Sequence, residues 1–263
     1  MDILNYATYK FVPLADPEQV RFDIYNQALR DGVKGTILVA HEGINVFCAA
    51  PVAAARNFMA WLKSDPRFAD IEPKESLSAI VPYLKLKVKV RPEIIKMNAP
   101  SIVPDDYRAP AVEAATLKRW LDAGVDDAGR PVVMLDTRNR FEIEYGTFKN
   151  TTQWDIDVFS QFPEAVATHK DEMAGKTVVS FCTGGIRCEK AALHMQAAGM
   201  DNVYQLEGGI LKYFEQTGGA HYDGQCFVFD DREAVDGALN PLRNEAKDVN
   251  ARTRVKGVVP QAN

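Results

Sequence analysis

The sequence lacks several features that would assign whole classes of function. None of its apolar runs approaches the roughly 18–20 residues that span a bilayer. Its first ten residues, MDILNYATYK, have neither the basic region nor the long apolar core of a secretory signal. The formal net charge is −5, so the molecule as a whole is not a polycation that binds nucleic acid indiscriminately, although a local basic patch is still allowed. We expect a cytoplasmic protein without membrane contact.

The sequence is also poor in residues that hold metals or form disulfides. Its four cysteines, Cys48, Cys182, Cys188 and Cys226, are too few and too irregularly spaced for a disulfide framework or a zinc site. The four histidines are scattered without the spacing of an iron-binding triad, and there is no dinucleotide fingerprint. We therefore predict no bound metal or cofactor. In a reducing cytosol the cysteines are free thiols, and the question is which one is reactive.

Strand and helix patterns alternate in the first part of the chain. Apolar runs such as GTILVA indicate buried strands, and apolar residues at helical spacing follow Asp16. The order βαββαβ predicts a ferredoxin-like (acylphosphatase-like) α+β domain over residues 1–97. The expected elements are strand 6–12, helix 17–30, strand 35–40, strand 44–48, helix 52–62 and strand 83–90.

A second α/β domain is expected after a linker at residues 98–110, which contains three prolines. From residue 111 to 231, short apolar strands alternate with helices, which predicts a parallel sheet flanked by helices. Residues 232–263 are polar and weakly periodic, so we expect a C-terminal arm that frays into disorder. The elements expected in the second domain are helix 112–121, strand 131–135, helix 162–169, strand 177–181, helix 188–198, strand 203–206 and a helix from 209.

One loop of this second domain carries the residues for chemistry. The buried strand TVVSF is followed by Cys182, Thr183, Gly184, Gly185, Ile186 and Arg187, and then by a helix. A cysteine at this place faces the unpaired amides and positive dipole of a helix N-terminus. Two glycines allow the amides to curl into an anion-binding nest, and the guanidinium adds positive charge. Each factor favours a thiolate or persulfide anion.

The spacing within the loop separates two kinds of chemistry. Cys-x4-Arg encloses a smaller ring than the Cys-x5-Arg loop of cysteine phosphatases, so it suits a single sulfur atom better than a tetrahedral phosphate. The alternative is a buried structural cysteine in a glycine-rich turn.

Further motifs in the second half resemble a rhodanese domain. They are LDTR (135–138), Glu142, Gly146, the CTGGIR loop and LEGGI (206–210). Rhodanese domains carry a persulfide on the loop cysteine, so the resemblance implies that Cys182 is the sulfur acceptor. It also implies that Asp136 and Arg138, at the end of the neighbouring strand, brace the loop. Glu142 has either a role in the site or a structural one, in capping or in pairing on the surface.

A narrower resemblance covers both domains, over residues 1 to about 232. The motifs FCTGGIRCEKAA, GTILVA-x-EGIN, DTRN-x-x-E-x-x-x-G-x-F and CFVFD-x-R are similar to those of the tRNA uridine(34) hydroxylase family. Two departures stand out. Val46 and Phe47 follow EGIN, where the family often has Gly-Thr. The chain also resembles a short form, without the cysteine-rich C-terminal segment of longer members.

The family resemblance implies a reaction. Its members convert the wobble uridine of certain tRNAs to 5-hydroxyuridine with molecular oxygen, so tRNA is the expected substrate, oxygen the co-substrate and the reductant unknown. A low-pKa cysteine adding at C6 of uracil would make C5 enolate-like and reactive. The alternatives are a sulfurtransferase that works through a cysteine persulfide, and a non-catalytic module, against which the intact Cys182 and Arg187 argue. No stable protein partner is evident.

Two further sets of residues have more than one interpretation. Cys188 could resolve an oxidised Cys182 as a disulfide, act as a second sulfur relay, or be a small buried residue. Lys85, Lys87, Lys89 and Arg91 alternate with apolar residues and lie on one face of a strand. They could contact tRNA phosphates, or the lysines could protect an edge strand from aggregation.

Overall fold

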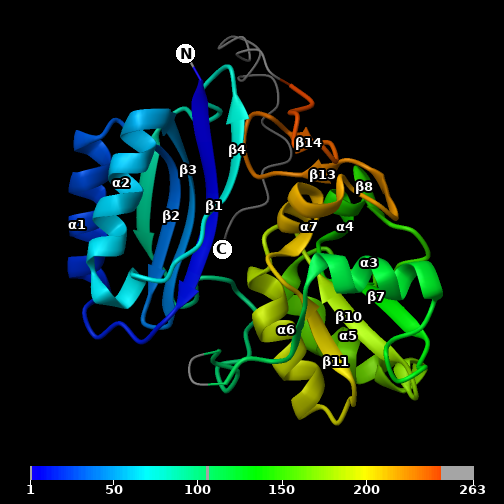
Figure 1. Ribbon diagram of the computed structural model, residues 1–263. Helices are drawn as coiled ribbons and strands as arrows, with labels where there is room; N and C mark the ends of the chain where they lie inside the picture. The colour runs from blue at the N-terminus through cyan, green and yellow to red at the C-terminus, as the bar shows by residue number, and fades with distance from the viewer. Residues whose placement is uncertain (1, 105–106, 244–263) are drawn as a thin grey trace.

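The computed structural model describes residues 2–104 and 107–243, which form two domains in chain order (Figure 1). In the first, one five-stranded sheet in the order β4-β1-β3-β2-β5 carries both helices on the same face. Its elements are β1 (Ile3–Phe11), α1 (Pro17–Arg30), β2 (Lys34–Ala40), β3 (Gly43–Pro51), α2 (Val52–Ser64), a 3-10 turn (Pro66–Phe68), β4 (Lys74–Ser78) and β5 (Leu86–Val90).

The ferredoxin-like prediction is confirmed, with one correction. Strands β1 to β4 and the two helices have the predicted βαββαβ order, and the four strands lie in the order 4-1-3-2. The predicted strand 83–90 does not close this unit. The fourth strand is Lys74–Ser78, and Leu86–Val90 is a fifth strand added parallel to β2 at the opposite edge. The sequence KESLS has little apolar character, so its pairing with β1 was not visible in the hydrophobic pattern.

The core of the first domain lies between the sheet and its helices. In α1, Val20, Ile24 and Ala28 recur at helical spacing and are buried. They pack with Val46 of β3 and Phe58 of α2 in one apolar cluster. This packing fixes which face of each strand points away from the helices.

The second domain is built on a five-stranded parallel sheet in the order β6-β11-β10-β7-β9. Helices α3 and α7 pack on one face, and α5 and α6 on the other. Its elements are β6 (Ala111–Val112), α3 (Ala114–Ala123), β7 (Val132–Asp136), α4 (Arg140–Ile143), β8 (Gly146–Phe148), β9 (Thr152–Gln153), two 3-10 turns (Phe159–Gln161 and Lys170–Met173), α5 (Phe162–His169), β10 (Thr177–Phe181), α6 (Ile186–Ala197), β11 (Val203–Leu206) and α7 (Gly209–Thr217).

Three short strands extend the second domain beyond α7. These are β12 (Tyr222–Gly224), β13 (Cys226–Phe227) and β14 (Ala234–Val235). Strand β12 pairs with β8, and β14 pairs with β13, so residues 232–243 fold back on the domain as an ordered arm. The rest of the expected arm, residues 244–263, lies outside the described residues.

The two domains are in direct contact through the helix-free face of the first sheet (Figure 1). Tyr9 of β1 donates a hydrogen bond of 2.9 Å to Glu189 of α6. Phe47 of β3 packs edge-on against Phe229, with ring centroids 6.3 Å apart. The first sheet therefore faces the end of the second domain that holds the cysteine loop, and we call the narrow space between them, lined by Ala7, Lys74, Leu211 and Arg232, the cleft.

Candidate active site

The cysteine loop lies where the parallel sheet predicts a site. Strand β10 is buried along its whole length and ends at Phe181. Cys182 follows at the carboxyl end of the sheet, and α6 begins at Ile186. Gly185 has a φ of +97°, in the left-handed region that glycine favours. Its N–H donates to Cys182 Sγ over 3.2 Å, which is the amide contact that the loop predicts.

The neighbours of Cys182 favour its thiolate. Burial is the largest influence and opposes ionisation, since the residue is only 1% exposed. The Cys188 thiol, the charge of Arg187 and the backbone amides of Arg187 and Gly185 outweigh it, and they lower the pKa of Cys182 to about 6. An ordinary cysteine has a pKa of roughly 8.5, so Cys182 is mostly thiolate at neutral pH.

Arg187 is held by a carboxylate that the sequence left open. Glu142 accepts two hydrogen bonds from the Arg187 guanidinium, of 2.6 and 2.7 Å, and the side chains are 0% and 6% exposed. Surface pairing is therefore excluded for Glu142. Glu142 lies in the first turn of α4. Its two carboxylate oxygens hold the arginine beside the loop through a bidentate pair of hydrogen bonds.

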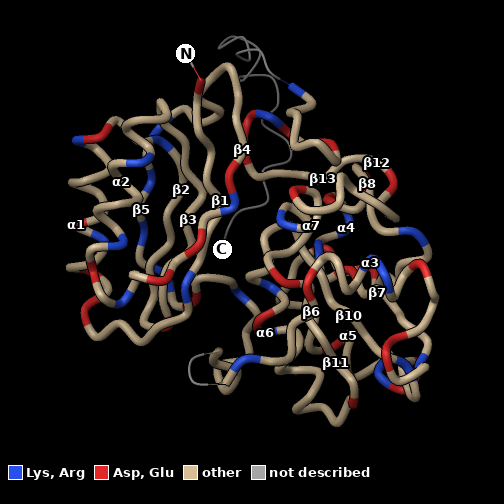
Figure 2. Tube along the Cα trace, in the orientation of Figure 1, with Lys and Arg blue, Asp and Glu red and all other residues tan. Residues whose placement is uncertain are grey.

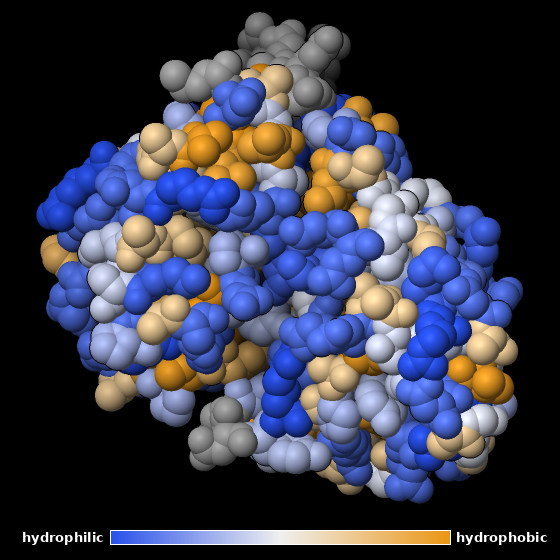
Figure 3. Space-filling model, viewed as in Figure 1, coloured by the Kyte–Doolittle hydropathy of each residue, from blue (hydrophilic) through white to orange (hydrophobic). Residues whose placement is uncertain are grey.

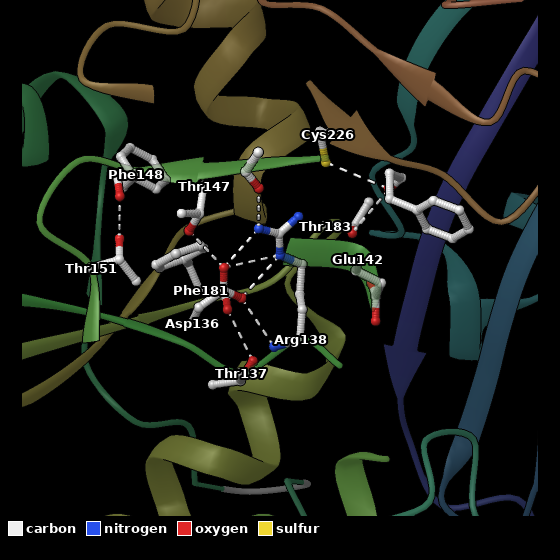
Figure 4. A network of polar contacts seen from close by, with 12 residues as sticks. Asp136, Thr137, Arg138, Glu142, Thr147, Phe148, Thr151, Phe181, Thr183 and Cys226 are labelled. Atoms are coloured by element: carbon white, nitrogen blue, oxygen red, sulfur yellow. Dashed lines mark hydrogen bonds and ion pairs between the residues drawn. The ribbon is translucent and has the colours of Figure 1, made fainter. Parts of the chain in front are cut away.

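Asp136 and Arg138 form a second buried ion pair, of 2.7 Å (Figure 4). Arg138 also donates to the Gly146 carbonyl over 2.7 Å, and Thr147 donates to Asp136 over 2.8 Å. The pair thus joins the end of β7 to β8. It meets the loop only indirectly, because the Arg138 guanidinium lies 5.9 Å from the centre of the Phe181 ring.

The direct brace comes from Thr137, which the sequence patterns did not single out. Its N–H and hydroxyl both donate to the Phe181 carbonyl, over 3.0 and 2.9 Å, immediately before Cys182. The hydroxyl also lies 3.7 Å from Cys188 Sγ. The sequence analysis singled out Asp136 and Arg138 of the DTR motif. Nothing in the sequence distinguished the threonine between them.

The other three thiols have the opposite character to Cys182. Burial raises the pKa of Cys48 well above its usual range and that of Cys226 to about 12. Burial and the neighbouring Cys182 sulfur raise the pKa of Cys188 as well. Cys188 therefore stays protonated, and its thiol is one of the neighbours that favour the Cys182 thiolate.

The LEGGI motif explains part of the loop's shape. Ile210 N–H donates to the Cys182 carbonyl over 2.9 Å, and Leu211 N–H donates to the Thr183 carbonyl over 3.1 Å. A Cβ on Gly209 would lie 2.6 Å from the Cys182 carbonyl oxygen, so only glycine allows α7 to approach this closely. A Cβ on Gly184 would meet no atom within 4 Å, so packing does not require glycine there.

The EGIN motif of the first domain holds the helix after the loop. Glu42 accepts from Ile94 N–H over 2.7 Å and pairs with Lys190 of α6 over 2.8 Å. Lys190 is 1% exposed and also pairs with Glu93, at 2.7 Å. Ile186 packs nearby in an apolar cluster with Ile94. Residues 46–47, where the sequence differs from the family pattern, take no part in these contacts. Phe47 instead packs its ring against Phe229.

The CFVFD-x-R motif closes the other side of the cleft. Asp230 and Arg232 form a buried ion pair of 2.6 Å. Arg232 also donates to Ser76 of β4 over 2.6 Å, and Tyr83 donates to Asp230 over 3.2 Å. Phe229 lies under the Arg187 guanidinium, 5.9 Å from its ring centre. The EGIN and CFVFD-x-R motifs, both outside the loop, therefore make contacts that join the two domains on either side of the cysteine loop.

The basic strand lies at the edge of the same cleft-facing sheet. Strand β5 is an edge strand, and Lys85, Lys87 and Lys89 are exposed. Val88 between them is buried against the helices, so Lys87 and Lys89 lie on the helix-free face. Arg91 follows and is half-buried. Figure 2 shows this row of positive charge along β5.

Comparisons with known proteins match both domains. Residues 3–94 match the UPF0176 acylphosphatase like domain family, and residues 113–216 match the rhodanese-like domain family. A protein of Thiobacillus denitrificans named tRNA uridine(34) hydroxylase is 59% identical over 242 residues, which cover 92% of this chain and 98% of that protein. Namesakes from Cupriavidus taiwanensis and Bordetella avium are 60% and 59% identical over 92% of this chain, and 86% and 100% of their own lengths are covered. The chain belongs to the tRNA uridine(34) hydroxylase family.

Solved structures similar to this member of the tRNA uridine(34) hydroxylase family include rhodanese-type chains. Saccharomyces cerevisiae Ygr203w, a homolog of single-domain rhodanese, is 18% identical over 44% of this chain and 87% of its own, with a TM-score of 0.37. The rhodanese-like domain of the Anabaena Alr3790 protein is 17% identical over 53% of this chain and 90% of its own, also at 0.37. Among the described residues, every helix is too short or too polar to span a bilayer.

Proposed function

We propose that this protein hydroxylates C5 of the wobble uridine, position 34, of tRNA, with Cys182 as the nucleophile. The observation that carries the proposal is the relationship over 92% of the chain to proteins named for this activity, at about 60% identity. The motifs shared with the family converge in space on one cysteine whose pKa is lowered to about 6.

The chemistry begins at the thiolate. Cys182 adds to C6 of uracil, a sulfur–carbon bond forms, and the C5–C6 π pair moves toward the C4 carbonyl. The resulting electron-rich C5 reacts with molecular oxygen. One oxygen atom stays on C5, the other leaves as water with two electrons and two protons from a reductant, and loss of the C5 proton and of the thiolate restores the double bond.

The target base has to enter a closed site. Cys182 is almost fully buried, so the target nucleotide must leave its stack to reach the sulfur. A base in the single-stranded anticodon loop does this at lower cost than a paired one, which suits position 34.

We infer that the helix-free face of the first sheet contacts the tRNA backbone. Lys87 and Lys89 lie on this face, flanked by Lys85 and Arg91, and Figure 3 shows hydrophilic side chains where the domains meet. The lysines also protect β5, an edge strand, from aggregation. This role is compatible with contacts to tRNA phosphates. Phosphate contacts would supply affinity and the uracil contacts selectivity.

Sulfur transfer is the competing function, because the same loop can hold a persulfide on Cys182. The two functions separate in one assay set. With tRNA and a reductant, wild-type protein should form 5-hydroxyuridine only when oxygen is present, and Cys182→Ser should form none. If tRNA is left unmodified while sulfur moves rapidly from thiosulfate to cyanide, sulfur transfer is the function.

A further inference from the structure

Lys74 places an ammonium group in the cleft beside the cysteine loop. It begins β4 and is paired in register with Ala7 of β1. The next residue, Glu75, pairs with Arg56 of α2, so Lys74 points to the helix-free face. Its Nζ lies 4.7 Å from the centre of the Tyr9 ring.

Two residues next to Lys74, Tyr9 and Gly208, lie beside the cysteine loop. The Tyr9 hydroxyl lies 3.0 Å from the position of a Cβ on Gly185. The Lys74 Cε lies 3.5 Å from the position of a Cβ on Gly208, and Gly208 itself is 3.5 Å from the Gly185 Cβ position. The ammonium therefore sits across the cleft from the loop that holds Cys182.

The charge of Lys74 has no carboxylate of its own. Within residues 2–104 and 107–243, its Nζ makes no hydrogen bond and no ion pair within 4.0 Å. The nearby carboxylates, Glu189 and Glu207, are both bound by Arg108, at 2.9 and 2.7 Å. Lys190 in the same interface shows the contrast, since it pairs with two glutamates.

Burial of Lys74, which is partial, makes its unpaired ammonium costly. It is the largest influence on Lys74 and lowers its pKa, while the charges of Glu207, Cys182 and Glu189 act in the opposite direction and that of Arg108 reinforces it. A cation kept in this state is available to an incoming negative charge.

We propose that Lys74 is a catalytic residue whose ammonium binds O4 of the target uracil and stabilises the negative charge that forms there. The inference rests on the proposed function and deepens it. When the Cys182 sulfur bonds to C6, the C5–C6 electron pair makes a C4–C5 enolate, and O4 carries the charge. An ammonium fixed in a partly dry cleft stabilises that oxygen without reorganisation.

The addition step can be measured without oxygen. If C6 addition occurs in ordinary water on a tRNA carrying one C5-deuterated uridine, at position 34, the enolate takes a solvent proton at C5. Elimination of the thiolate then removes either hydrogen isotope, so deuterium is lost from the tRNA at a rate that mass spectrometry follows.

Four proteins test the role of Lys74: the wild type and three variants. Lys74→Met should slow deuterium loss by about tenfold to a hundredfold at saturating tRNA, with a KM within about threefold of wild type. Lys74→Arg should retain a large part of the rate, since it keeps the charge. Lys10→Met is the matched control, because Lys10 pairs with Asp70 outside the cleft, and it should exchange like wild type.

The outcomes separate the two proposals. Wild-type exchange that Lys74→Met leaves unchanged overturns the role of Lys74 and leaves the thiolate addition standing. A rise in KM alone, with an unchanged rate at saturation, assigns Lys74 to phosphate binding and also overturns the proposal. If wild type does not exchange, the thiolate addition itself fails, and the role of Lys74 fails with it.

Discussion

Glu142 and Arg187 form a buried, two-pronged ion pair beside the loop that holds Cys182, with oxygen–nitrogen distances of 2.6 and 2.7 Å. The pair joins α4 to the first turn of α6 and holds a positive charge at a fixed place near Cys182. The guanidinium is satisfied by Glu142, so it lowers the pKa of the thiol by its charge and position and not through a side-chain hydrogen bond.

Removal of this carboxylate should destabilise the protein. Glu142→Gln leaves Arg187 buried without a counter-charge, which costs about 3–5 kcal/mol in comparable pairs. We expect a clear fall in the urea midpoint of unfolding. Glu144→Gln, two residues away and exposed, is the control and should change the midpoint little. Equal midpoints for the two variants would contradict the structural role of Glu142.

The pH dependence of alkylation tests the thiolate. Since the pKa of Cys182 is lowered to about 6, its reaction with iodoacetamide should reach half its maximal rate near pH 6 and should rise with pH through that value. Cys182→Ser should be nearly unreactive at pH 7, because burial raises the pKa of the other three thiols. A half-maximal rate near pH 8.5, the ordinary value, would contradict the activated loop.

Arg187→Ala separates the guanidinium from the amides. Without its charge, burial should prevail more strongly and raise the pKa of Cys182, so alkylation at pH 7 should slow several-fold. The measurement is the same pH profile, displaced to higher pH. An unchanged profile would mean that Cys188 and the backbone amides alone set the thiolate.

Local patterns were sufficient to predict much of the fold. Pro17 opens a helix whose apolar residues recur at helical spacing, and the element ends at Arg30 as expected. TVVSF is buried on both faces, as a short, largely apolar strand in a parallel sheet should be. The geometry of the cysteine loop was predictable too, since the loop sequence itself supplies the glycine at +97° and an amide that faces Cys182.

The contacts between distant segments could not be predicted in the same way. Tyr9 and Glu189 are 180 residues apart in sequence, and neither has a periodicity that points to the other. The polar strand β4 is set by pairing with β1, and β6, β9, β13 and β14 have two residues each, too few for any pattern. The sequence analysis did not single out Lys74, because its proposed role depends on residues of the second domain that lie across the cleft.

The salt bridges of Lys190 should hold the two domains together. Lys190→Ala leaves Glu42 and Glu93 close to each other without their cation, at a cost of about 3 kcal/mol or more. We expect faster proteolysis in the linker at residues 98–110. Lys96→Ala, an exposed residue of the same region, is the control. Equal cleavage rates would show that the domains stay together without this cluster.

Charge reversal tests the tRNA face. Changing Lys85, Lys87 and Lys89 to Glu should weaken tRNA binding and reduce the salt slope by roughly one unit for each phosphate that the protein no longer neutralises. Reversal of Arg21, Arg30 and Lys63 on α1 and α2, on the opposite side of the same sheet, should change binding little. Binding that is unaltered by the first set would leave β5 as a protected edge strand only.

Labelled oxygen tests the central claim most directly. Purified protein, tRNA and a reductant are incubated under 18O2 in ordinary water, and the nucleosides are analysed by mass spectrometry. The proposed reaction predicts one 18O atom in 5-hydroxyuridine at position 34, and no product with Cys182→Ser. Product that carries its label only when the water is labelled, or no product from folded wild-type protein, would contradict it.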